Sequence, residues 1–459
     1  MSEAVAAAIA ELKEKLGERI VTANAVREHH SHDTSRLAPV LPDAVAFPAS
    51  EADVQAIVRV CAAHGVPVTP FGAGSSMEGH IIPVKGGISI DTRDMNRIIE
   101  ISPEDAVAVV QPGVTRKQLN TELRDAGFMF PVDPGADASL GGMASTRGSG
   151  TTAVRYGTMR ENVMGLKVVT PEGELIRTGS RARKSSTGYD LTHLFVGAEG
   201  TLGIITELTV KLHPIPEHVS SAICAFDSVR GAVEAVIATI QYGIPVARVE
   251  FVDEVAIANV NAYSKLSLKS APTLFFEFHG TQAWVAEQAQ IVEEIVKDHG
   301  GAGFAWTTDA EERNRLWQAR HDLYWATKAG RPGCELYTSD ICVPISQLAE
   351  AILAARADIE GSFLTGQIIG HVGDGNYHVA YQVDPNDERE LAEAERLVDL
   401  QIERALAVGG TTSGEHGIGM GKIKFLRREH GAAVDVMKRI KTALDPQGIM
   451  NPGKMGSAG

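Results

Sequence analysis

The sequence has few cysteines, no long apolar run and fewer basic than acidic residues. Its cysteines, Cys61, Cys224, Cys334 and Cys342, lack the paired spacing of a zinc site or a disulfide framework, which fits a reducing compartment. Since no run of 18 apolar residues occurs, we predict no membrane-spanning helix. The 43 Lys and Arg against 58 Asp and Glu give a net charge of −15, which argues against nucleic acid as a partner because phosphate binding needs a basic surface.

The remaining composition is that of a globular protein. Among 459 residues, 44% are hydrophobic and 22% are charged, which predicts two or three domains at about 150 residues per domain. Residues 1–20 place apolar residues at helical spacing among Glu and Lys, without the basic start and apolar core of a secretory signal. We therefore expect an N-terminal surface helix and a cytoplasmic protein, with the inner face of the membrane as an alternative location.

Two regions differ in their pattern. Residues 37–216 alternate short β-like runs with glycine-rich turns and a few helical stretches, whereas 217–459 carry longer helices between strands. The prolines of His213–Glu217 break helix and sheet alike, so this segment is predicted to be a linker. We expect an α+β protein with an N-terminal helical segment over 1–36, and an antiparallel sheet covered by helices packed on one face in the second region.

Four glycine-rich segments punctuate the first region. None has the G-x-G-x-x-G spacing of a Rossmann turn or the Lys-Ser/Thr end of a P-loop. Small residues leave backbone N–H groups accessible to a pyrophosphate and let the backbone approach a flat ring. One large anionic cofactor explains all four segments better than four unrelated loops do. The segments are Pro70–His80, Val132–Gly150, Val154–Asn162 and Gly197–Glu207.

The segment HVGDGNYH, residues 371–378, predicts a β-hairpin with Asp374 and Gly375 in a two-residue turn. In that register His371 pairs with His378, and the two imidazoles can converge on one divalent metal. Glu415, within the glycine-rich run TTSGEHGIGMGK, is the candidate third ligand. The alternative is a cross-strand pair of surface histidines without a metal. Two His and one carboxylate leave positions open for a substrate, as catalytic metals require, and they accommodate Zn²⁺, Mn²⁺ or Fe²⁺.

These motifs together resemble a known family. PFGAGSSMEGH, VVQPGV, PGADASLGG and EGTLGIIT resemble the FAD-binding domain of the vanillyl-alcohol oxidase/p-cresol methylhydroxylase superfamily. HVGDGNYH, SGEHGIGMGK and LDPQGIMNPGK resemble the C-terminal domain of its D-2-hydroxy-acid dehydrogenase branch, and RPGC with SDICVPIS resembles the cytochrome-type D-lactate dehydrogenases. The resemblance implies a two-part FAD-binding domain over 37–216 and a substrate-binding cap over 217–459, whose C-terminal segment, about 415–459, returns to the flavin.

The resemblance also assigns residues to the cofactor. FAD is expected to bind non-covalently, although His80 stands where some members of the superfamily attach the flavin. Positions carried over as cofactor-binding are Gly72, Gly74, Ser75, Ser76, Gly79, Pro134, Gly135, Leu140, Gly141, Gly142, Gly148, Glu199, Gly200, Gly203, Ile205 and Asn451.

The implied reaction oxidises a D-2-hydroxy acid to the 2-oxo acid, with a hydride passing to the flavin. Arg320 aligns with the arginine that holds the substrate carboxylate, and His416 is the expected general base beside a Zn or Mn site of His371, His378 and Glu415. Relatives that act on 2-hydroxyglutarate have a lysine where this chain has Thr338, and a polar residue where it has Ala380. Both differences favour D-lactate or another apolar monocarboxylate.

Several functional alternatives remain open. Electrons would pass on to a cytochrome, a quinone or an electron-transfer flavoprotein, and a homodimer is one possible assembly. The competing functions are the FAD subunit of a glycolate oxidase complex, a D-2-hydroxyglutarate dehydrogenase and, more distantly, a flavin-using alkyl transferase.

Overall fold

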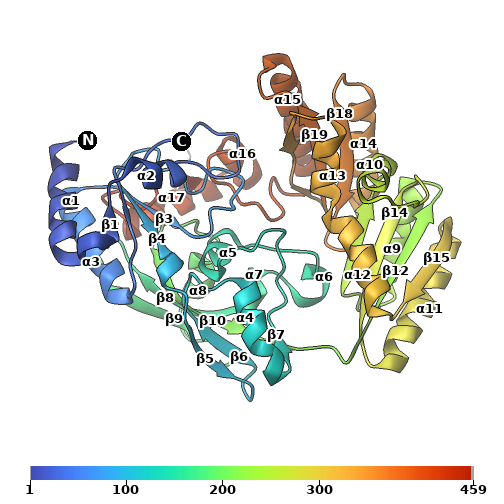
Figure 1. The fold of residues 1–459 in the computed structure, drawn as a ribbon, viewed down its shortest axis with the longest axis horizontal. Coiled ribbons are helices and arrows are strands. Elements are labelled where there is room, and N and C mark those ends of the chain that lie inside the picture. The colour runs from blue at the N-terminus through green and yellow to red at the C-terminus, as the bar shows by residue number, and fades with distance from the viewer. Residues whose placement is uncertain (1, 456–459) are drawn as a thin grey trace. The chain divides into compact units, whose positions relative to one another are not determined.

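The computed structural model describes residues 2–455, which divide into two compact units (Figure 1). Unit 1 comprises residues up to 150, residues 157–215 and residues from 415 onward, and unit 2 comprises residues 151–156 and 216–414. The N-terminal residues and the C-terminal segment therefore belong to the same unit as the glycine-rich loops at 72–80 and 197–203. The predicted α+β class is confirmed.

Unit 1 contains two sheets. The smaller sheet has the order β1 (Ile20–Val21), β2 (Ala44–Ala46), β4 (Ile88–Asp91) and β3 (Val68–Phe71), with parallel pairing of β2 and β3 to β4. The larger sheet is antiparallel, in the order β5 (Ile98–Ser102), β6 (Val107–Val110), β10 (Ile204–Lys211), β8 (Val163–Val169) and β9 (Leu175–Gly179). A short pair joins β7 (Phe128–Met129) to β11 (His213–Pro214), so the predicted linker begins as a strand.

The helices of unit 1 pack around these sheets. They are α1 (Glu3–Leu16), α2 (Asn24–His29), α3 (Glu51–His64), α4 (Arg116–Leu123), α5 (Leu140–Thr146), α7 (Met159–Asn162), α8 (Leu191–Phe195), α16 (Ile423–His430) and α17 (Ala433–Leu444). The predicted N-terminal helix is confirmed as α1, whose buried positions recur at helical spacing and pack against α3. Ser50 caps the start of α3 and Gly65 ends it in the left-handed conformation.

Unit 2 is built on one antiparallel sheet of eight strands. Its order is β15 (Gly301–Thr307), β12 (His218–Phe226), β14 (Thr273–Gly280), β13 (Arg248–Val252), β18 (Thr365–Gly370), β19 (Asn376–Val383) and β16 (Glu335–Thr338), with β17 (Ile341–Cys342) also paired to β19. The predicted antiparallel sheet is confirmed. The expectation that the helices pack on one face is wrong, because β14 and β19 are buried at nearly every position and so need cover on both faces.

Helices cover both faces of this sheet (Figure 1). One layer consists of α9 (Val229–Gln241), α11 (Gln282–Asp298), α14 (Leu348–Glu360) and α15 (Glu388–Ala407). The other face receives α6 (Ala153–Tyr156), α10 (Glu254–Ser264), α12 (Ala310–His321) and α13 (Leu323–Gly330). On this second face, Phe275, Val252 and Ile369 pack under Trp317 and Leu323, so α12 and α13 are fixed beside the ends of β13 and β18.

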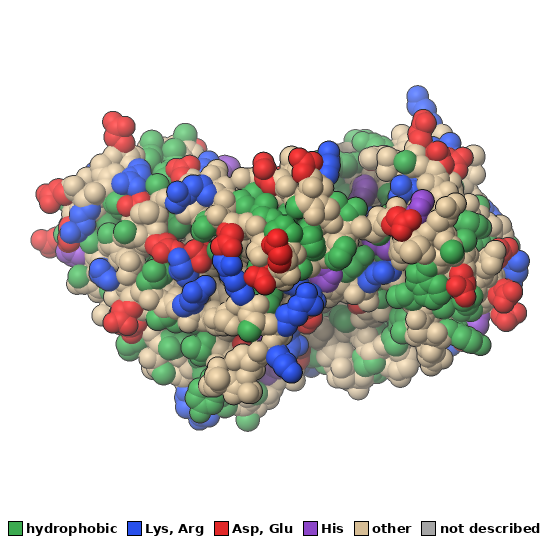
Figure 2. All heavy atoms as spheres, turned by 90° about the horizontal axis from the view of Figure 1, so that it is seen from below, with side chains coloured by type: hydrophobic (Ala, Val, Ile, Leu, Met, Phe, Trp, Pro, Cys, Tyr) green, Lys and Arg blue, Asp and Glu red, His purple; other side chains and the backbone are tan. Residues whose placement is uncertain are grey.

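On the face that Figure 2 shows, acidic and basic side chains are interspersed. None of the helices within residues 2–455 is long and apolar enough to cross a bilayer.

The C-terminal segment is anchored inside unit 1. Asn451 donates its backbone N–H to Val68 O at 2.8 Å, and its side-chain amide donates to His80 O at 3.0 Å and Glu199 O at 2.7 Å. The Glu199 carboxylate accepts the N–H groups of Ile418 and Gly419 at 2.7 and 3.0 Å and lies 3.2 Å from the buried His80 ring. The C-terminal segment is therefore held within unit 1, with Glu199 at the junction.

The His80–Glu199 pair makes stability depend on pH. Although burial alone would lower the pKa of His80, Glu199 raises it above 6.5; burial would likewise raise the pKa of Glu199, but His80 lowers it below 4.5. The stabilisation from His80 is complete below its ordinary pKa and is lost as pH rises through the raised value. The stabilisation from Glu199 is complete above its ordinary pKa and is lost as pH falls through the lowered value.

We predict that the loss of unfolding free energy in His80→Gln is largest between pH 4.5 and 6.5 and shrinks on either side. Urea unfolding of both proteins across this range measures the difference. His64→Gln is the control, because the His64–Glu11 pair lies at the surface and such pairs contribute little. A difference independent of pH would contradict the ion pair.

Candidate active site

Two histidines share one face of the unit 2 sheet where β18 connects to β19. His378 pairs with Ile369, and β18 ends at Gly370, so His371 lies in the connection rather than opposite His378. The predicted two-residue turn with direct His371–His378 pairing is therefore wrong. The connection spans residues 371–375. Within it, Gly375 packs so closely against Val343 O that a Cβ would lie 2.1 Å from that atom.

The two imidazole rings are close together even though the predicted pairing is wrong. His371 follows Ile369, the partner of His378, by two residues, and a shift of two residues keeps a side chain on the same face of a sheet. The ring centroids lie 5.4 Å apart, and ring nitrogens of the two residues lie within 4.8 Å of one another.

Each ring uses its Nδ1 for a protein partner. His371 Nδ1 lies 2.7 Å from Glu250 Oε1, and His378 Nδ1 lies 3.0 Å from Ser339 O. Asp340 is a further neighbour of His378 Nδ1, at 3.9 Å. Hydrogen bonds at Nδ1 select the tautomer in which Nε2 carries the lone pair, which is the arrangement of most histidine ligands to metals.

Glu250 joins His371 to the predicted substrate arginine. Its Oε2 accepts from Arg320 Nε at 3.0 Å and from Nη2 at 2.7 Å, and the carboxylate has no exposed surface. Burial alone would raise the pKa of Glu250, but His371 and Arg320 lower it below the ordinary value. Arg320 is thus brought close to the histidines by a carboxylate that the sequence analysis did not single out.

Unit 2 also fixes the start of the segment that contains Glu415 and His416. Ser413 Oγ donates to Asp340 Oδ2 at 2.7 Å, and Asn376 Nδ2 donates to Asp340 Oδ1 at 2.9 Å. Gly414 packs against the Asn376 amide so closely that a Cβ would lie 2.1 Å from it. Glu415 is the next residue, and consecutive Cα atoms are about 3.8 Å apart.

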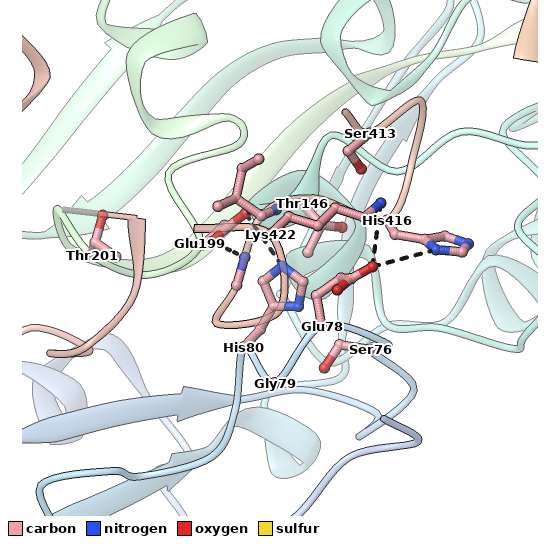
Figure 3. A network of polar contacts seen from close by, with 12 residues as sticks. Ser76, Glu78, Gly79, His80, Thr146, Glu199, Thr201, Ser413, His416 and Lys422 are labelled. Carbon is pink, nitrogen blue, oxygen red and sulfur yellow. Dashed lines mark hydrogen bonds and ion pairs between the residues drawn. The ribbon is translucent and has the colours of Figure 1, made fainter. Parts of the chain in front are cut away.

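In unit 1, His416 belongs to a polar cluster with Glu78 and Lys422 (Figure 3). Glu78 Oε1 lies 3.8 Å from His416 Nδ1 and 3.2 Å from Lys422 Nζ, and all three side chains are largely buried. The glycines of GIGMGK allow this approach, since a Cβ at Gly419 would lie 2.1 Å from Glu78 O and one at Gly421 would lie 2.2 Å from Glu78 Oε2.

The predicted cofactor residues all lie in unit 1, and several of their loops meet there. Gly72 approaches α5 so closely that a Cβ would lie 2.5 Å from Ser139 Oγ, and Glu199 N donates to Ser145 O in α5 at 2.9 Å. The positions fall after β3, around α5, before and within β10, and in the C-terminal tail. They are Gly72, Gly74, Ser75, Ser76, Gly79, Pro134, Gly135, Leu140, Gly141, Gly142, Gly148, Glu199, Gly200, Gly203, Ile205 and Asn451.

The polar atoms around these loops fit a bound ligand. Ser139 Oγ, Asn451 Oδ1 and His80 Nδ1 are buried and have no hydrogen-bond partner within residues 2–455. His80 Nε2 approaches Glu199 as an ion pair rather than as an aligned hydrogen bond. Buried polar groups are normally satisfied, so orphaned atoms beside glycine loops indicate a polar ligand, as expected for FAD.

The remaining glycine-rich segment behaves differently. Its first residues belong to unit 2, where Arg155 Nη1 donates to Pro245 O at 2.8 Å and Tyr156 Oη lies 2.7 Å from His279 Nδ1. The expectation that one cofactor explains all four segments therefore lacks support for residues 154–156, whose side chains hold α6 against unit 2.

Sequence reasoning missed Glu250 and Glu78. Glu250 had a usable signal, because ARVEFVDE alternates charged and apolar residues in a short strand and so predicts a charged row on one face. Glu78 had none, since a loop glutamate among small residues is ordinarily exposed. Its burial depends on the close approach of Gly419 and Gly421, which are distant in sequence.

Comparisons with known proteins agree with this geometry. Residues 42–179 match the family "FAD binding domain", and residues 215–455 match "FAD linked oxidases, C-terminal domain". A probable mitochondrial D-lactate dehydrogenase of Danio rerio is 49% identical, with 95% of this chain and 89% of that protein covered. A mitochondrial cytochrome-type D-lactate dehydrogenase of Arabidopsis thaliana is 45% identical, with 97% and 79% covered. The fold is that of solved p-cresol methylhydroxylase, with a TM-score of 0.82 at 20% identity over 99% of this chain and 97% of the other.

The relatives also correct the expected location. Both are named as mitochondrial proteins, so the prediction of a cytoplasmic protein, including its membrane-associated form, is wrong by this comparison. The grounds for it were scattered cysteines and a helical N-terminal pattern, and neither distinguishes one reducing compartment from another.

The match over both domains and the identity to these relatives lead to one conclusion: the chain belongs to the FAD-linked oxidases of the vanillyl-alcohol oxidase/p-cresol methylhydroxylase superfamily, in the branch of the cytochrome-type D-lactate dehydrogenases.

Proposed function

We propose that this FAD-linked enzyme oxidises D-lactate, or a related apolar D-2-hydroxy acid, to the 2-oxo acid at a divalent metal held by His371, His378 and Glu415. The observation that supports the metal most directly is the anchoring of both histidines through Nδ1, because it makes Nε2 the nitrogen of each ring that would bind the cation. The alternative is a pair of surface histidines without a metal. Such a pair would not need a buried partner at Nδ1 of each ring.

The donor set fits a divalent cation. Two imidazoles and one carboxylate are ligands that Zn²⁺ and Mn²⁺ accept, and three protein ligands leave positions for a substrate. Glu415 directly follows the Ser413–Gly414 segment, which is fixed to Asp340 and Asn376 beside His378. This covalent neighbourhood supports Glu415 as the third ligand.

When bound, FAD accepts the two electrons and the cation lowers the pKa of the substrate hydroxyl. The chain's own residues bind and orient the acid and move its proton. Arg320, held through Nε and Nη2 by Glu250, retains Nη1 for the substrate carboxylate. His416 takes the hydroxyl proton on its imidazole, and Glu78 at 3.8 Å stabilises the resulting cation.

The substrate class follows from the side chains beside His378. Ala380 lies two residues along β19 on the same face and pairs with Thr338 on β16 and with Gln367 on β18. This row contains no cation that would bind a second carboxylate, which favours a monocarboxylate over 2-hydroxyglutarate. Electrons then pass to a separate acceptor, for which a cytochrome is the proposal because the Arabidopsis relative is named cytochrome-type.

Anaerobic bleaching of the flavin absorbance tests the reaction. We predict fast reduction by D-lactate, and slow or no reduction by L-lactate and D-2-hydroxyglutarate. EDTA treatment should abolish the fast phase, and added Zn²⁺ or Mn²⁺ should restore it. Glu415→Ala should behave like the chelated enzyme while retaining FAD, and Glu14→Ala, on the exposed side of α1, should behave like the wild type.

Equal reduction by both lactate enantiomers, or by none of these acids, would contradict the proposed substrate. Full metal content in Glu415→Ala would remove that residue from the site.

A separate variant tests the general base. His416→Ala should slow flavin reduction by D-lactate about 10²–10⁴-fold, because the proton acceptor is lost, while metal and FAD contents stay at the wild-type level. His430→Ala, a half-exposed histidine at the end of α16, is the control. Reduction near the wild-type rate in His416→Ala would refute the role.

A further inference from the structure

One buried carboxylate contacts both a proposed metal ligand and the arginine that is proposed to bind the substrate carboxylate. Glu250 on β13 uses Oε1 for His371 and Oε2 for Arg320, and it lies on the sheet face that also carries His378. We propose that Glu250 is a positioning residue, which fixes the His371 tautomer for metal binding and holds Arg320 beside the metal. This inference rests on the proposed function, since it assigns a role toward the same metal.

The argument begins with hydrogen-bond roles. An ionised carboxylate only accepts hydrogen bonds, so His371 Nδ1 has to be the protonated nitrogen at the 2.7 Å contact. The lone pair of His371 then resides on Nε2. A carboxylate behind a histidine ligand orients the ring and raises its basicity, and loss of such a partner typically costs 10–100-fold in metal affinity.

Arg320 allows the Glu250 carboxylate to stay ionised in the interior, where it can accept from His371 and also hold the arginine. A buried carboxylate without a cation would be costly, and the two hydrogen bonds from the guanidinium compensate its charge. Among the residues that the structure describes, Glu250 is the partner of Arg320. The distance between the proposed metal ligand and the carboxylate-binding cation is therefore set by a single side chain.

Replacement by glutamine breaks this arrangement without changing its size. An amide has one acceptor oxygen and one NH₂ donor, whereas Glu250 accepts on both sides. If the oxygen stays with Arg320, the NH₂ group faces His371 Nδ1 and favours the other tautomer, with a proton on Nε2. If the oxygen faces His371 instead, the NH₂ group meets the N–H donors of Arg320.

The adjacent strand provides a matched control. Glu277 on β14 pairs in register with Arg248 on β13, is also buried, and lies 2.9 Å from His279 Nε2 and 3.5 Å from Arg248. It has the same types of partner on the same sheet face, but none of them is a proposed metal ligand. Glu277→Gln therefore reports the general cost of removing a buried carboxylate from this sheet.

The experiment uses the FAD-loaded protein after metal removal. Titration with Zn²⁺ should show affinity about 10–100-fold weaker in Glu250→Gln, with Glu277→Gln within about twofold of the wild type. Glu250→Asp, which keeps the charge, should recover part of the loss and serves if the glutamine variant does not fold. Histidine ¹⁵N NMR should assign the lone pair of His371 to Nε2 in the wild type and in Glu277→Gln only.

The outcomes separate this inference from the proposed function. Zn²⁺ affinity that is lost in His371→Ala but unchanged in Glu250→Gln and Glu250→Asp would overturn the role of Glu250 alone. If Zn²⁺ binding to the wild-type protein does not depend on His371, the metal site and this inference are both overturned.

Discussion

A carboxylate that is removed from water has to be surrounded by donors, and this requirement organises the interior of each unit. In unit 1, Glu199 is buried against His80 and collects the backbone N–H groups of Ile418 and Gly419, which fixes the C-terminal segment to the glycine loops. In unit 2, Glu250 collects His371 and Arg320. Breaking either arrangement would leave an uncompensated charge in the interior, so the partners stay where the carboxylate holds them.

The same requirement explains what sequence reasoning could recover. Local patterns predicted the α+β class, the N-terminal helix and the antiparallel sheet of the second region, because these depend on hydrophobic periodicity and on the turns between segments. The predicted register of the histidine connection was wrong, since β18 ends at Gly370 and Ile369 pairs with His378. The connection also contacts Val343, which is distant in sequence and which no local pattern indicates. The shared face of His371 and His378 survived because the error was two residues, which preserves the side-chain alternation.

Contacts between residues that are far apart in the chain could not be predicted from the sequence. The contact between Glu250 and His371 joins residues 121 positions apart, and the contact between Glu199 and Ile418 joins residues 219 apart. No local motif encodes such pairs, although the alternation of Arg248 and Glu250 in a short strand indicated a charged row. The role of Gly419 and Gly421 was likewise visible only with Glu78 beside them.

The fold itself leaves the chemistry open. p-Cresol methylhydroxylase has the same fold at 20% identity, and one fold commonly supports several reactions. The side chains that bear on the proposed reaction are His371 and His378 beside one sheet face and Arg320 near the end of α12, and each is held by a buried acceptor. Under the proposed function, specificity depends on these side chains rather than on the architecture.

X-ray absorption at the edge of the metal in the purified holoenzyme tests the central claim most directly. The account predicts a first shell of nitrogen and oxygen at about 2.0–2.2 Å with the multiple scattering of two imidazoles, reduced to one imidazole in His371→Ala. A first shell without imidazole, or an unchanged shell in His371→Ala, would contradict it.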